Sequence, residues 1–289
     1  MKKIRAKSPA KLNLTLEVTK KLPDGFHELR TVMLKSENLF DELEIILDKK
    51  KTGIKITCDN PVVPTDEKNI CWKIAEQFFQ KTGKHIGLEL RIKKNIPLAS
   101  GMGGGSSDGA TVLLTLNSYF KHILSEKELI ALAAKAGKDI PFFLSKASAA
   151  NIAGMGEKIR PLKNFPKLVI LIINLTGEIS TPWAYSELDQ NLLFMNDAKR
   201  KNISQEFIKN KSNLRKMSSC LYNDFSVVAK KKYPAIETLE KALLSFGAIG
   251  TSLTGKGPTV FGIFQTKKDA LRTKKILQKY YQQFFIELA

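Results

Sequence analysis

Four glycines fall within the five residues from Gly101 to Gly105, inside the segment PLASGMGGGSSDGATVLLTLN (97–117). The residues before this run are strand-like, and those from Ser106 to about Phe120 place apolar side chains at helical spacing. A glycine loop between a strand and a helix exposes backbone N–H groups beside the positive end of the helix dipole. The segment therefore predicts a phosphate-binding loop in preference to a linker or a merely tight helix entry.

Two common glycine fingerprints do not fit the chain. The dinucleotide pattern G-x-G-x-x-G fails because Ser106 stands three residues after Gly103. The segment GTSLTGKG (250–257) has the spacing of a P-loop, but Pro258 and a strand-like run follow it where a P-loop needs a helix. Neither a Rossmann domain nor a P-loop domain is therefore predicted.

The remaining pattern mixes strands and helices. Residues 11–18 alternate between apolar and polar side chains, which predicts a half-buried strand with a polar face. Further strands are expected within 23–33, 41–47, 53–58 and 85–98, and a helix from about residue 70 to Gly83. Ser125 and Glu128 form a capping box for a helix that Gly137 ends.

Five stretches together resemble the GHMP family of small-molecule kinases. The glycine segment resembles the phosphate-binding motif of this family, and the other matches follow in the family's order over nearly the whole chain. They are SPAKLNLTLEV (8–18) with DGFHELRTVM (24–33), GKDIPFF (137–143), GMGEKI (154–159) and LTGKGPTVFGIF (253–264). Each stretch alone would be a weak signal, whereas the ordered set is specific.

The resemblance implies a two-domain α+β architecture. An N-terminal ribosomal-protein-like α/β domain is expected over residues 1–162, and a C-terminal ferredoxin-like α/β sandwich over residues 163–289. The order strand, helices, two strands, helix, strand in the second half independently favours the split β-α-β arrangement.

The implied activity is ATP-dependent and Mg²⁺-dependent phosphorylation of a small alcohol. The match is strongest to the branch whose acceptor is a cytidine diphosphate-linked methylerythritol, phosphorylated on its 2-hydroxyl in the non-mevalonate isoprenoid pathway. A family member acting on another small alcohol is the alternative. Phe26 and His27, which match an aromatic-histidine pair that holds cytosine, favour the cytidine acceptor.

The resemblance also assigns roles to individual residues. Asp139 is the expected base and Lys11 its cationic neighbour. The residues alone equally allow Asp139 as a helix N-cap, and they favour Lys11 as a solvated strand lysine. Expected substrate contacts are Asn13, Phe26, His27, Thr181 and Tyr185. Expected ATP contacts are Asn69, Lys94, Pro97, Leu98, Ala99, Ser100, Gly101, Met102, Gly103, Gly104, Gly105, Ser106 and Ser107.

One residue departs from the family pattern, and the metal ligands are not assigned. Lys256 stands in the third motif where the family usually has a short side chain. The hydroxyls of Ser106 and Ser107 can donate to phosphate or bind Mg²⁺. Thr181 and Tyr185 can instead be explained as the start and packing face of a helix that begins near Pro182.

The net charge of +19 raises nucleic-acid binding as a rival function. The lysines are scattered in short groups without interleaved aromatic residues, which favours a solvated surface that also suits an acidic small substrate. A nucleic-acid partner is therefore not expected. We expect a monomer or a weak homodimer.

Several other classes are also disfavoured. No apolar run approaches the roughly 20 residues of a membrane-spanning helix, and the basic N-terminus breaks into polar residues before a secretory segment could form. A cytoplasmic protein is therefore expected. The three cysteines contain no C-x-x-C pair, so they suggest neither a disulfide framework nor a zinc site.

Overall fold

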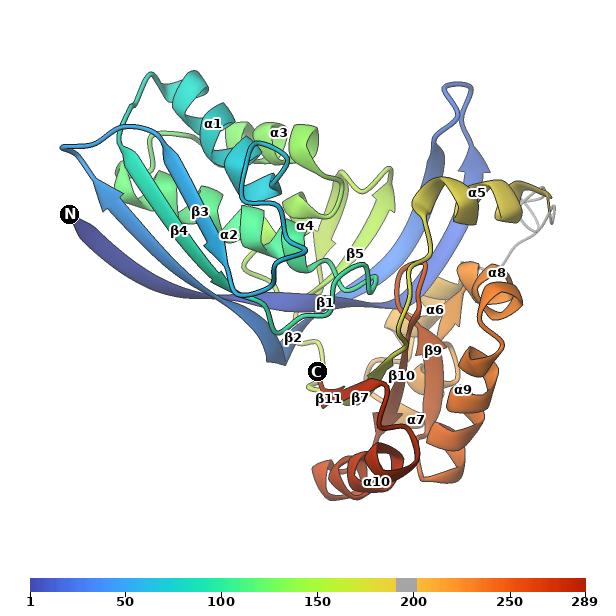
Figure 1. Cartoon of the computed structure of the whole chain (residues 1–289). Helices are drawn as coiled ribbons and strands as arrows, with labels where there is room; N and C mark the ends of the chain where they lie inside the picture. Colours follow the sequence, from blue (N-terminus) through green and yellow to red (C-terminus); the bar gives the residue numbers. More distant parts are fainter. Residues whose placement is uncertain (191–201) are drawn as a thin grey trace. The chain divides into compact units, whose positions relative to one another are not determined.

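In the computed structural model, which describes residues 1–190 and 202–289, the chain divides into two compact units (Figure 1). Unit 1 comprises Met1–Ala10, Leu39–Ile96 and Gly103–Lys146. Unit 2 comprises Lys11–Asn38, Pro97–Met102 and Ala147–Ala289. Each unit is assembled from separate stretches of chain, and the domain boundary expected between residues 162 and 163 stays a prediction.

In unit 1, the helices α1 to α4 lie on one face of a β-sheet (Figure 1). The parallel pair β3–β4 continues into the antiparallel pair β4–β2. The strands are the first half of β1 (Lys2–Lys21), the second half of β2 (His27–Asp48), β3 (Ile54–Cys58) and β4 (Gly87–Lys93). The helices are α1 (Ile70–Thr82), α2 (Gly104–Tyr119), α3 (Glu126–Ala136) and α4 (Ile140–Leu144).

The helix boundaries in unit 1 follow local capping chemistry. Gly83 takes the left-handed conformation that ends α1, and the Ser125–Glu128 capping box begins α3, so both predictions are confirmed. The helix α2 begins at Gly104, two residues before the predicted start, because Gly103 rather than a serine occupies the N-cap. Apolar side chains of these helices, such as Ile74, Phe78 and Leu113, are fully buried.

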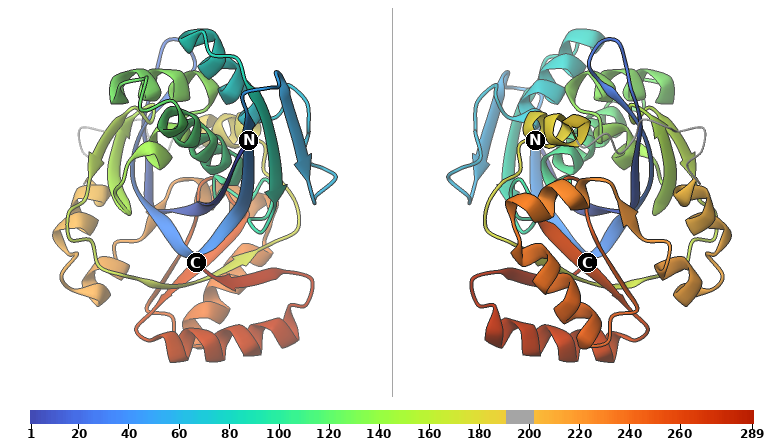
Figure 2. Two further views of the ribbon diagram at one scale, coloured as in Figure 1. Left: turned by 90° about the vertical axis from the view of Figure 1, so that its left-hand side faces the viewer. Right: turned by 90° about the vertical axis from the view of Figure 1, so that its right-hand side faces the viewer.

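Unit 2 contains an antiparallel four-stranded sheet in the order β11-β7-β10-β9, and Figure 2 shows α10 lying along it. This arrangement confirms the ferredoxin-like half of the predicted fold. The strands are β7 (Val169–Asn174), β9 (Gly250–Leu253), β10 (Thr259–Phe264) and β11 (Phe285–Leu288); the helices are α5 (Thr181–Gln190), α6 (Ile203–Lys209), α7 (Leu214–Ser218), α8 (Phe225–Lys232), α9 (Ala235–Ser245) and α10 (Lys267–Tyr280).

A second set of strand pairs belongs to unit 2. The first half of β2 pairs with β5 (Ala149–Gly154), β5 pairs with β6 (Lys158–Pro161), and β1 (Lys2–Lys21) pairs with β8 (Tyr222–Asn223). The separate strands expected within 23–33 and 41–47 are one continuous strand, β2. No glycine or proline interrupts residues 34–40, so nothing local breaks the extended chain.

The prediction that residues 11–18 form a half-buried strand is wrong, because its polar face is buried as well. The four polar side chains of this stretch are at most 4% exposed, so both faces of the strand are buried. Their polar atoms have partners from distant segments of unit 2. Examples are the Asn13 amide, which donates to Thr31 Oγ1 at 2.8 Å, and the Glu17 carboxylate, which accepts from the backbone N–H of Ser204 at 2.9 Å.

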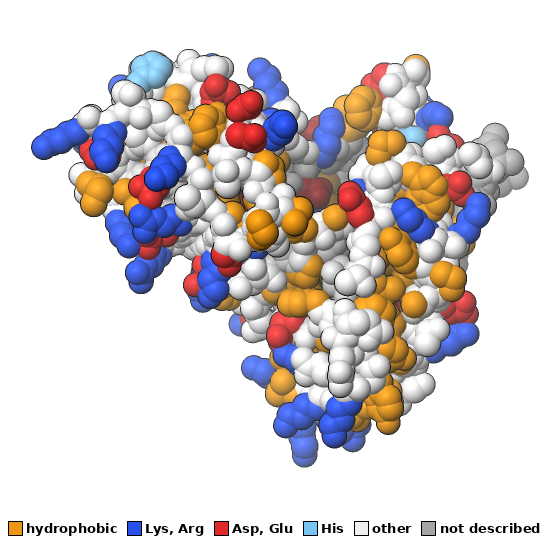
Figure 3. Space-filling view, viewed as in Figure 1, with side chains coloured by type: hydrophobic (Ala, Val, Ile, Leu, Met, Phe, Trp, Pro, Cys, Tyr) orange, Lys and Arg blue, Asp and Glu red, His pale blue; other side chains and the backbone are white. Residues whose placement is uncertain are grey.

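Lysine and arginine side chains lie on solvated surfaces of both units. The helix α10 alone carries six of them, and Figure 3 shows blue side chains at the lower edge of the molecule, where α10 lies in Figure 1. In unit 1 several are paired, as in Lys93 with Glu42 and Arg91 with Glu44. Among the helices that the structure describes, none combines the length and apolar character needed to span a membrane.

Candidate active site

The predicted site residues fall into two groups, one in each unit. The unit 1 group consists of Asn69, Lys94, the loop residues Gly103 to Ser107, and Asp139. The unit 2 group contains the other predicted residues, which are Lys11, Asn13, Phe26, His27, the loop residues Pro97 to Met102, Thr181 and Tyr185.

In unit 2, the first part of the glycine loop is held against β1 and the third motif. The backbone N–H of Lys11 donates to the carbonyl of Met102 at 2.9 Å, and Thr259 Oγ1 donates to the carbonyl of Ser100 at 2.8 Å. Met102 is fully buried, which anchors the loop at its centre. The sequence segments of the first, second and third motifs therefore meet here.

Gly101 shows why this contact requires glycine. Its φ is +78°, and a Cβ atom at this position would lie 2.6 Å from the carbonyl oxygen of Thr254. A Cβ on Gly255, whose φ is +58°, would in turn lie 3.0 Å from the carbonyl oxygen of Gly101. The two glycine segments pack backbone against backbone, which side chains would prevent.

Asn13 organises the polar atoms next to this contact. Its side-chain oxygen accepts from the ammonium of Lys11 at 2.5 Å and from the backbone N–H of Gly255 at 3.0 Å, and its backbone N–H donates to Thr254 Oγ1 at 2.9 Å. Lys11 is 4% exposed, so the interpretation as a solvated strand lysine is wrong. The substrate contact expected of Asn13 stays a prediction.

Lys256 reaches another predicted substrate residue. Its ammonium donates to Thr181 Oγ1 at 2.6 Å. Burial, together with the positive charge of Lys11, lowers the pKa of Lys256, although Glu178 opposes the shift. Lys256, the residue that departs from the family pattern, thus adds a second ammonium group near that of Lys11.

We expect Lys256→Ser to change the Michaelis constant for ATP or for the acceptor less than tenfold. The substitution removes one solvent-exposed hydrogen bond, from Lys256 to Thr181, which is worth about 1 kcal/mol. Steady-state kinetics with each substrate varied in turn would measure the change. The variant Lys241→Ser, on the exposed face of α9, controls for loss of one surface charge. A loss of activity above a hundredfold would instead assign Lys256 a catalytic role.

The contacts with cytosine that were predicted for Phe26 and His27 stay predictions, and the structure shows how the two side chains lie. His27 is buried and stacks on Tyr185, with ring centroids 4.5 Å apart and an interplanar angle of 20°. Phe26 is 55% exposed. The ring of His27 also contacts Asp189, a residue that the sequence did not single out, with Nε2 2.7 Å from Oδ1.

In unit 1, the second part of the glycine loop forms the N-terminus of α2. Gly103 is the N-cap with φ +69°, and its carbonyl accepts the first intrahelical bond, from Ser107, at 2.9 Å. The N–H groups of Gly104, Gly105 and Ser106 therefore precede the helical ladder. Backbone N–H groups in this position can bind phosphate.

A buried ion cluster lies directly beneath Gly104. The ammonium of Lys94 pairs with the carboxylates of Asp41 and Asp108, and a Cβ on Gly104 would lie 3.1 Å from Lys94 Nζ. Asp41 also accepts from the backbone N–H groups of Asn95 and Ile96 at 2.7 and 2.8 Å. The cluster therefore fixes the chain that leads into the loop.

The two aspartates of this cluster were missed by the sequence analysis. Burial, reinforced by Asp41, raises the pKa of Asp108 to about 7, even though Lys94 opposes the shift. Asp108 Oδ1 and the hydroxyl of Ser107 are buried and make no hydrogen bond with any residue that the structure describes. Such atoms cost roughly 1–3 kcal/mol unless a ligand or water pairs with them.

The other two predicted residues of unit 1 occupy helix caps. Asn69 is the N-cap of α1: its side chain accepts from the backbone N–H of Cys71 at 2.8 Å and donates to the carbonyl of Pro64 at 2.6 Å. Asp139 stands at the N-cap position of α4, with Pro141 in the first turn, but its carboxylate makes no capping hydrogen bond. Asp139 therefore occupies the N-cap position, but its side chain does not cap the helix.

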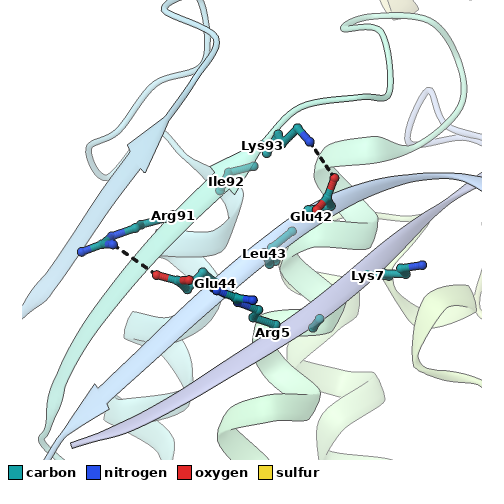
Figure 4. Close-up of a pocket in the computed structure, with 9 residues that line it drawn as sticks. Arg5, Lys7, Glu42, Leu43, Glu44, Arg91, Ile92 and Lys93 are labelled. Carbon is teal, nitrogen blue, oxygen red and sulfur yellow. Dashed lines mark hydrogen bonds and ion pairs between the residues drawn. The ribbon is translucent and has the colours of Figure 1, made fainter.

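A groove of about 750 Å³ on unit 1 is a separate feature (Figure 4). It lies over strands β1, β2 and β4, with the helices behind them, and none of the predicted site residues lines it. Its carboxylates are paired, Glu42 with Lys93 at 2.9 Å and Glu44 with Arg91 at 3.2 Å. It therefore adds nothing to the candidate active site.

Comparisons with known proteins match nearly the whole chain. The family model "GHMP kinases N terminal domain" matches residues 69–147, and "GHMP kinases C terminal" matches residues 204–283. The 4-diphosphocytidyl-2-C-methyl-D-erythritol kinase of Citrifermentans bemidjiense is 36% identical over 93% of this chain and 92% of its own length. The protein of the same name from Pelobacter propionicus is 37% identical over 93% of this chain and 92% of its own length.

Solved structures agree on the fold. A crystal structure of 4-(cytidine 5'-diphospho)-2C-methyl-D-erythritol kinase has a TM-score of 0.78 and 24% identity, covering 99% of this chain and 98% of that one. The homoserine kinase of Cytophaga hutchinsonii has a TM-score of 0.75 and 18% identity, covering 100% of this chain and 94% of that one. These likenesses confirm the predicted two-domain α+β architecture.

Proposed function

The chain belongs to the GHMP kinase family, and we propose that it transfers the γ-phosphoryl group of ATP to the 2-hydroxyl of 4-diphosphocytidyl-2-C-methyl-D-erythritol. The products are the 2-phosphate and ADP, in the non-mevalonate pathway to isoprenoid precursors. The observation that carries the proposal is the 36–37% identity to kinases of that name over more than nine-tenths of both chains.

The phosphates of ATP bind the loop from Pro97 to Ser107 in this proposal. The N–H groups that precede the α2 ladder donate to them, and the buried cluster under Gly104 holds the loop in place. Asn69 and Lys94 serve the adenosine end of ATP, as the family resemblance implies. Both side chains already have hydrogen-bond partners within unit 1, which makes their conformation well defined.

The reaction needs a hydroxyl nucleophile, a place for its proton and positive charge near the transferred group. The acceptor oxygen forms a bond to the γ-phosphorus while the bond to the β,γ-bridging oxygen breaks, and Asp139 receives the hydroxyl proton. Lys11, oriented by Asn13, supplies positive charge. Asn13, Phe26, His27, Thr181 and Tyr185 contact the acceptor.

Magnesium fits the same loop. Mg²⁺ prefers oxygen ligands and is usually held by few protein groups together with substrate phosphates and water. The buried hydroxyl of Ser107, which has no hydrogen-bond partner among the described residues, is an oxygen of the required kind. We assign Ser107 as the chain's ligand; when bound, the ion neutralises phosphate charge that develops during transfer.

A coupled assay of ADP release tests the proposed function. We expect ADP release with ATP, Mg²⁺ and 4-diphosphocytidyl-2-C-methyl-D-erythritol, and none when the acceptor lacks the cytidyl group. If the protein is folded and binds ATP but neither acceptor leads to ADP release, other alcohols should be tested as acceptors. Salt-sensitive RNA binding without phosphoryl transfer would support the rival function instead.

We also propose that the enzyme acts in the cytoplasm as a monomer or a weak homodimer. Sedimentation at micromolar concentrations would measure the oligomeric state, and a stable higher assembly would contradict this expectation.

A further inference from the structure

The hydroxyl of Thr31 lies beside the side-chain amide of Asn13, inside unit 2. Thr31 belongs to β2 and Asn13 to β1, and both residues are fully buried. Thr31 Oγ1 is 2.5 Å from the carbonyl oxygen of Thr15 and 2.8 Å from Asn13 Nδ2. A carbonyl oxygen only accepts, so the hydroxyl proton of Thr31 goes to Thr15 and its oxygen accepts from Asn13. Thr31 therefore requires the NH2 end of the Asn13 amide on its side.

The other end of the Asn13 amide faces groups that only donate. The ammonium of Lys11 lies 2.5 Å from Asn13 Oδ1, and the backbone N–H of Gly255 lies 3.0 Å from it. The Gly255 backbone is itself fixed by Asn223, whose Nδ2 donates to the carbonyls of Gly255 at 2.7 Å and Leu253 at 2.8 Å. Both ends of the amide thus demand the same orientation, with the oxygen toward Lys11.

The Thr31 hydroxyl matters because the amide it holds is buried. Without that hydroxyl the NH2 group of Asn13 would lose the acceptor on the side of β2, and a buried donor without a partner is costly. The Asn13 side chain would then gain by rotating toward another acceptor, which moves its oxygen away from Lys11. Lys11 is 4% exposed, so little water is present to take the place of that oxygen.

We propose that Thr31 is a positioning residue for phosphoryl transfer: its hydroxyl fixes the amide of Asn13, and the amide oxygen holds the Lys11 ammonium in place. The proposal rests on the proposed function, in which Lys11 supplies positive charge near the transferred group. Thr31 acts through Asn13 and Lys11 and touches neither substrate.

Thr31→Val removes the hydroxyl and keeps a branched side chain that suits a β-strand. We expect kcat to fall about tenfold, because a buried NH2 group loses its partner and Lys11 loses its fixed position. The affinity for ATP should stay within about twofold of the wild-type value, since the charge of Lys11 acts in the transition state. Thr31→Ser keeps the hydroxyl and should restore most of the lost activity.

The matched control is Thr273→Val in the same unit. Thr273, on α10, is fully buried, and its hydroxyl donates to the carbonyl of Phe246 at 2.8 Å. This variant also removes a buried hydroxyl that donates to a backbone carbonyl, but it leaves the bonds of Asn13 intact. It should lose thermal stability and keep the wild-type kcat. Wild-type kcat in Thr31→Val, or an equal loss of kcat in the control, would overturn the proposal.

A double-mutant cycle tests whether Thr31 acts through Lys11. The residual transfer activity of Lys11→Met would be measured in single turnovers, with and without Thr31→Val. We expect little further loss from Thr31→Val in this background, because the ammonium that it positions is already gone. Equal losses in the two backgrounds would mean that Thr31 acts independently of Lys11, which contradicts the proposal.

A readout that needs no acceptor separates this proposal from the proposed function. Labelling with ¹⁵N reports the side-chain NH2 groups of asparagine, and Asn13→Asp identifies the signal of Asn13. We expect slow exchange of this NH2 group with solvent in the wild type and in Thr31→Ser, and faster exchange in Thr31→Val. Unchanged exchange in Thr31→Val would refute the proposal. Absence of ADP release from the wild type would refute the proposed function without altering this measurement.

Discussion

Asp139→Asn should lower kcat by about three orders of magnitude, within the range that general acid–base catalysis contributes. Asparagine has nearly the shape of aspartate but cannot receive the proton of the acceptor hydroxyl. The carboxylate of Asp139 makes no capping bond to α4, so the substitution removes no helix cap. The affinity for ATP should therefore stay within about twofold of the wild-type value.

Single-turnover kinetics would measure this loss, with ATP binding followed separately by calorimetry. Asp48→Asn is the matched control, because Asp48 is the last residue of β2, outside the predicted site, and its carboxylate accepts from the backbone N–H of Lys50. Near-normal turnover in the Asp139 variant would refute its assignment as the base. Loss of ATP binding along with turnover would point to a structural defect instead.

The sequence predicted features whose causes are local. The glycine segment, the capping box at Ser125 and the helix end at Gly83 each depend on a few neighbouring residues, and the structure confirms the last two. The glycine segment does lie between a strand and a helix. Its helix begins at Gly104 because glycine can also serve as an N-cap.

Features that depend on distant residues were not predictable. Alternation along residues 11–18 indicates two faces but does not reveal what covers each. The polar face is buried because Ser204 and Thr254 approach it from more than 180 residues away. Burial of polar groups with partners leaves no mark on the local pattern.

The same limit applies to charged residues of the candidate site. Lys94 was predicted to serve ATP, yet no local pattern relates it to Asp41, 53 residues earlier. Asp189 lies 162 residues from His27, and only its i+4 spacing from Tyr185 could have suggested a shared face. A glycine run marks where backbone must approach a ligand, whereas the side chains that hold it are set by tertiary packing.

Gly103→Val should weaken ATP binding by about tenfold or more. Gly103 has φ +69°, a left-handed conformation that costs a non-glycine residue roughly 1–2 kcal/mol and costs a β-branched residue more. Valine would relieve this strain by moving the backbone that directs the first N–H groups of α2. If the backbone moves to avoid this strain, its N–H groups no longer point at the phosphate. A loss of about 1.4 kcal/mol of binding free energy corresponds to a tenfold loss of affinity, which is the size of the expected effect.

The decisive comparison is with Gly83→Val, because Gly83 has nearly the same backbone conformation, φ 66° and ψ 14° against φ 69° and ψ 23°. A Cβ on Gly83 would meet nothing within 4 Å, so this variant carries the strain at the end of α1, away from the loop. Both variants should lose thermal stability, but only Gly103→Val should lose affinity for ATP in a titration. Equal ATP affinity in the two variants would mean that the backbone at Gly103 does not bind phosphate.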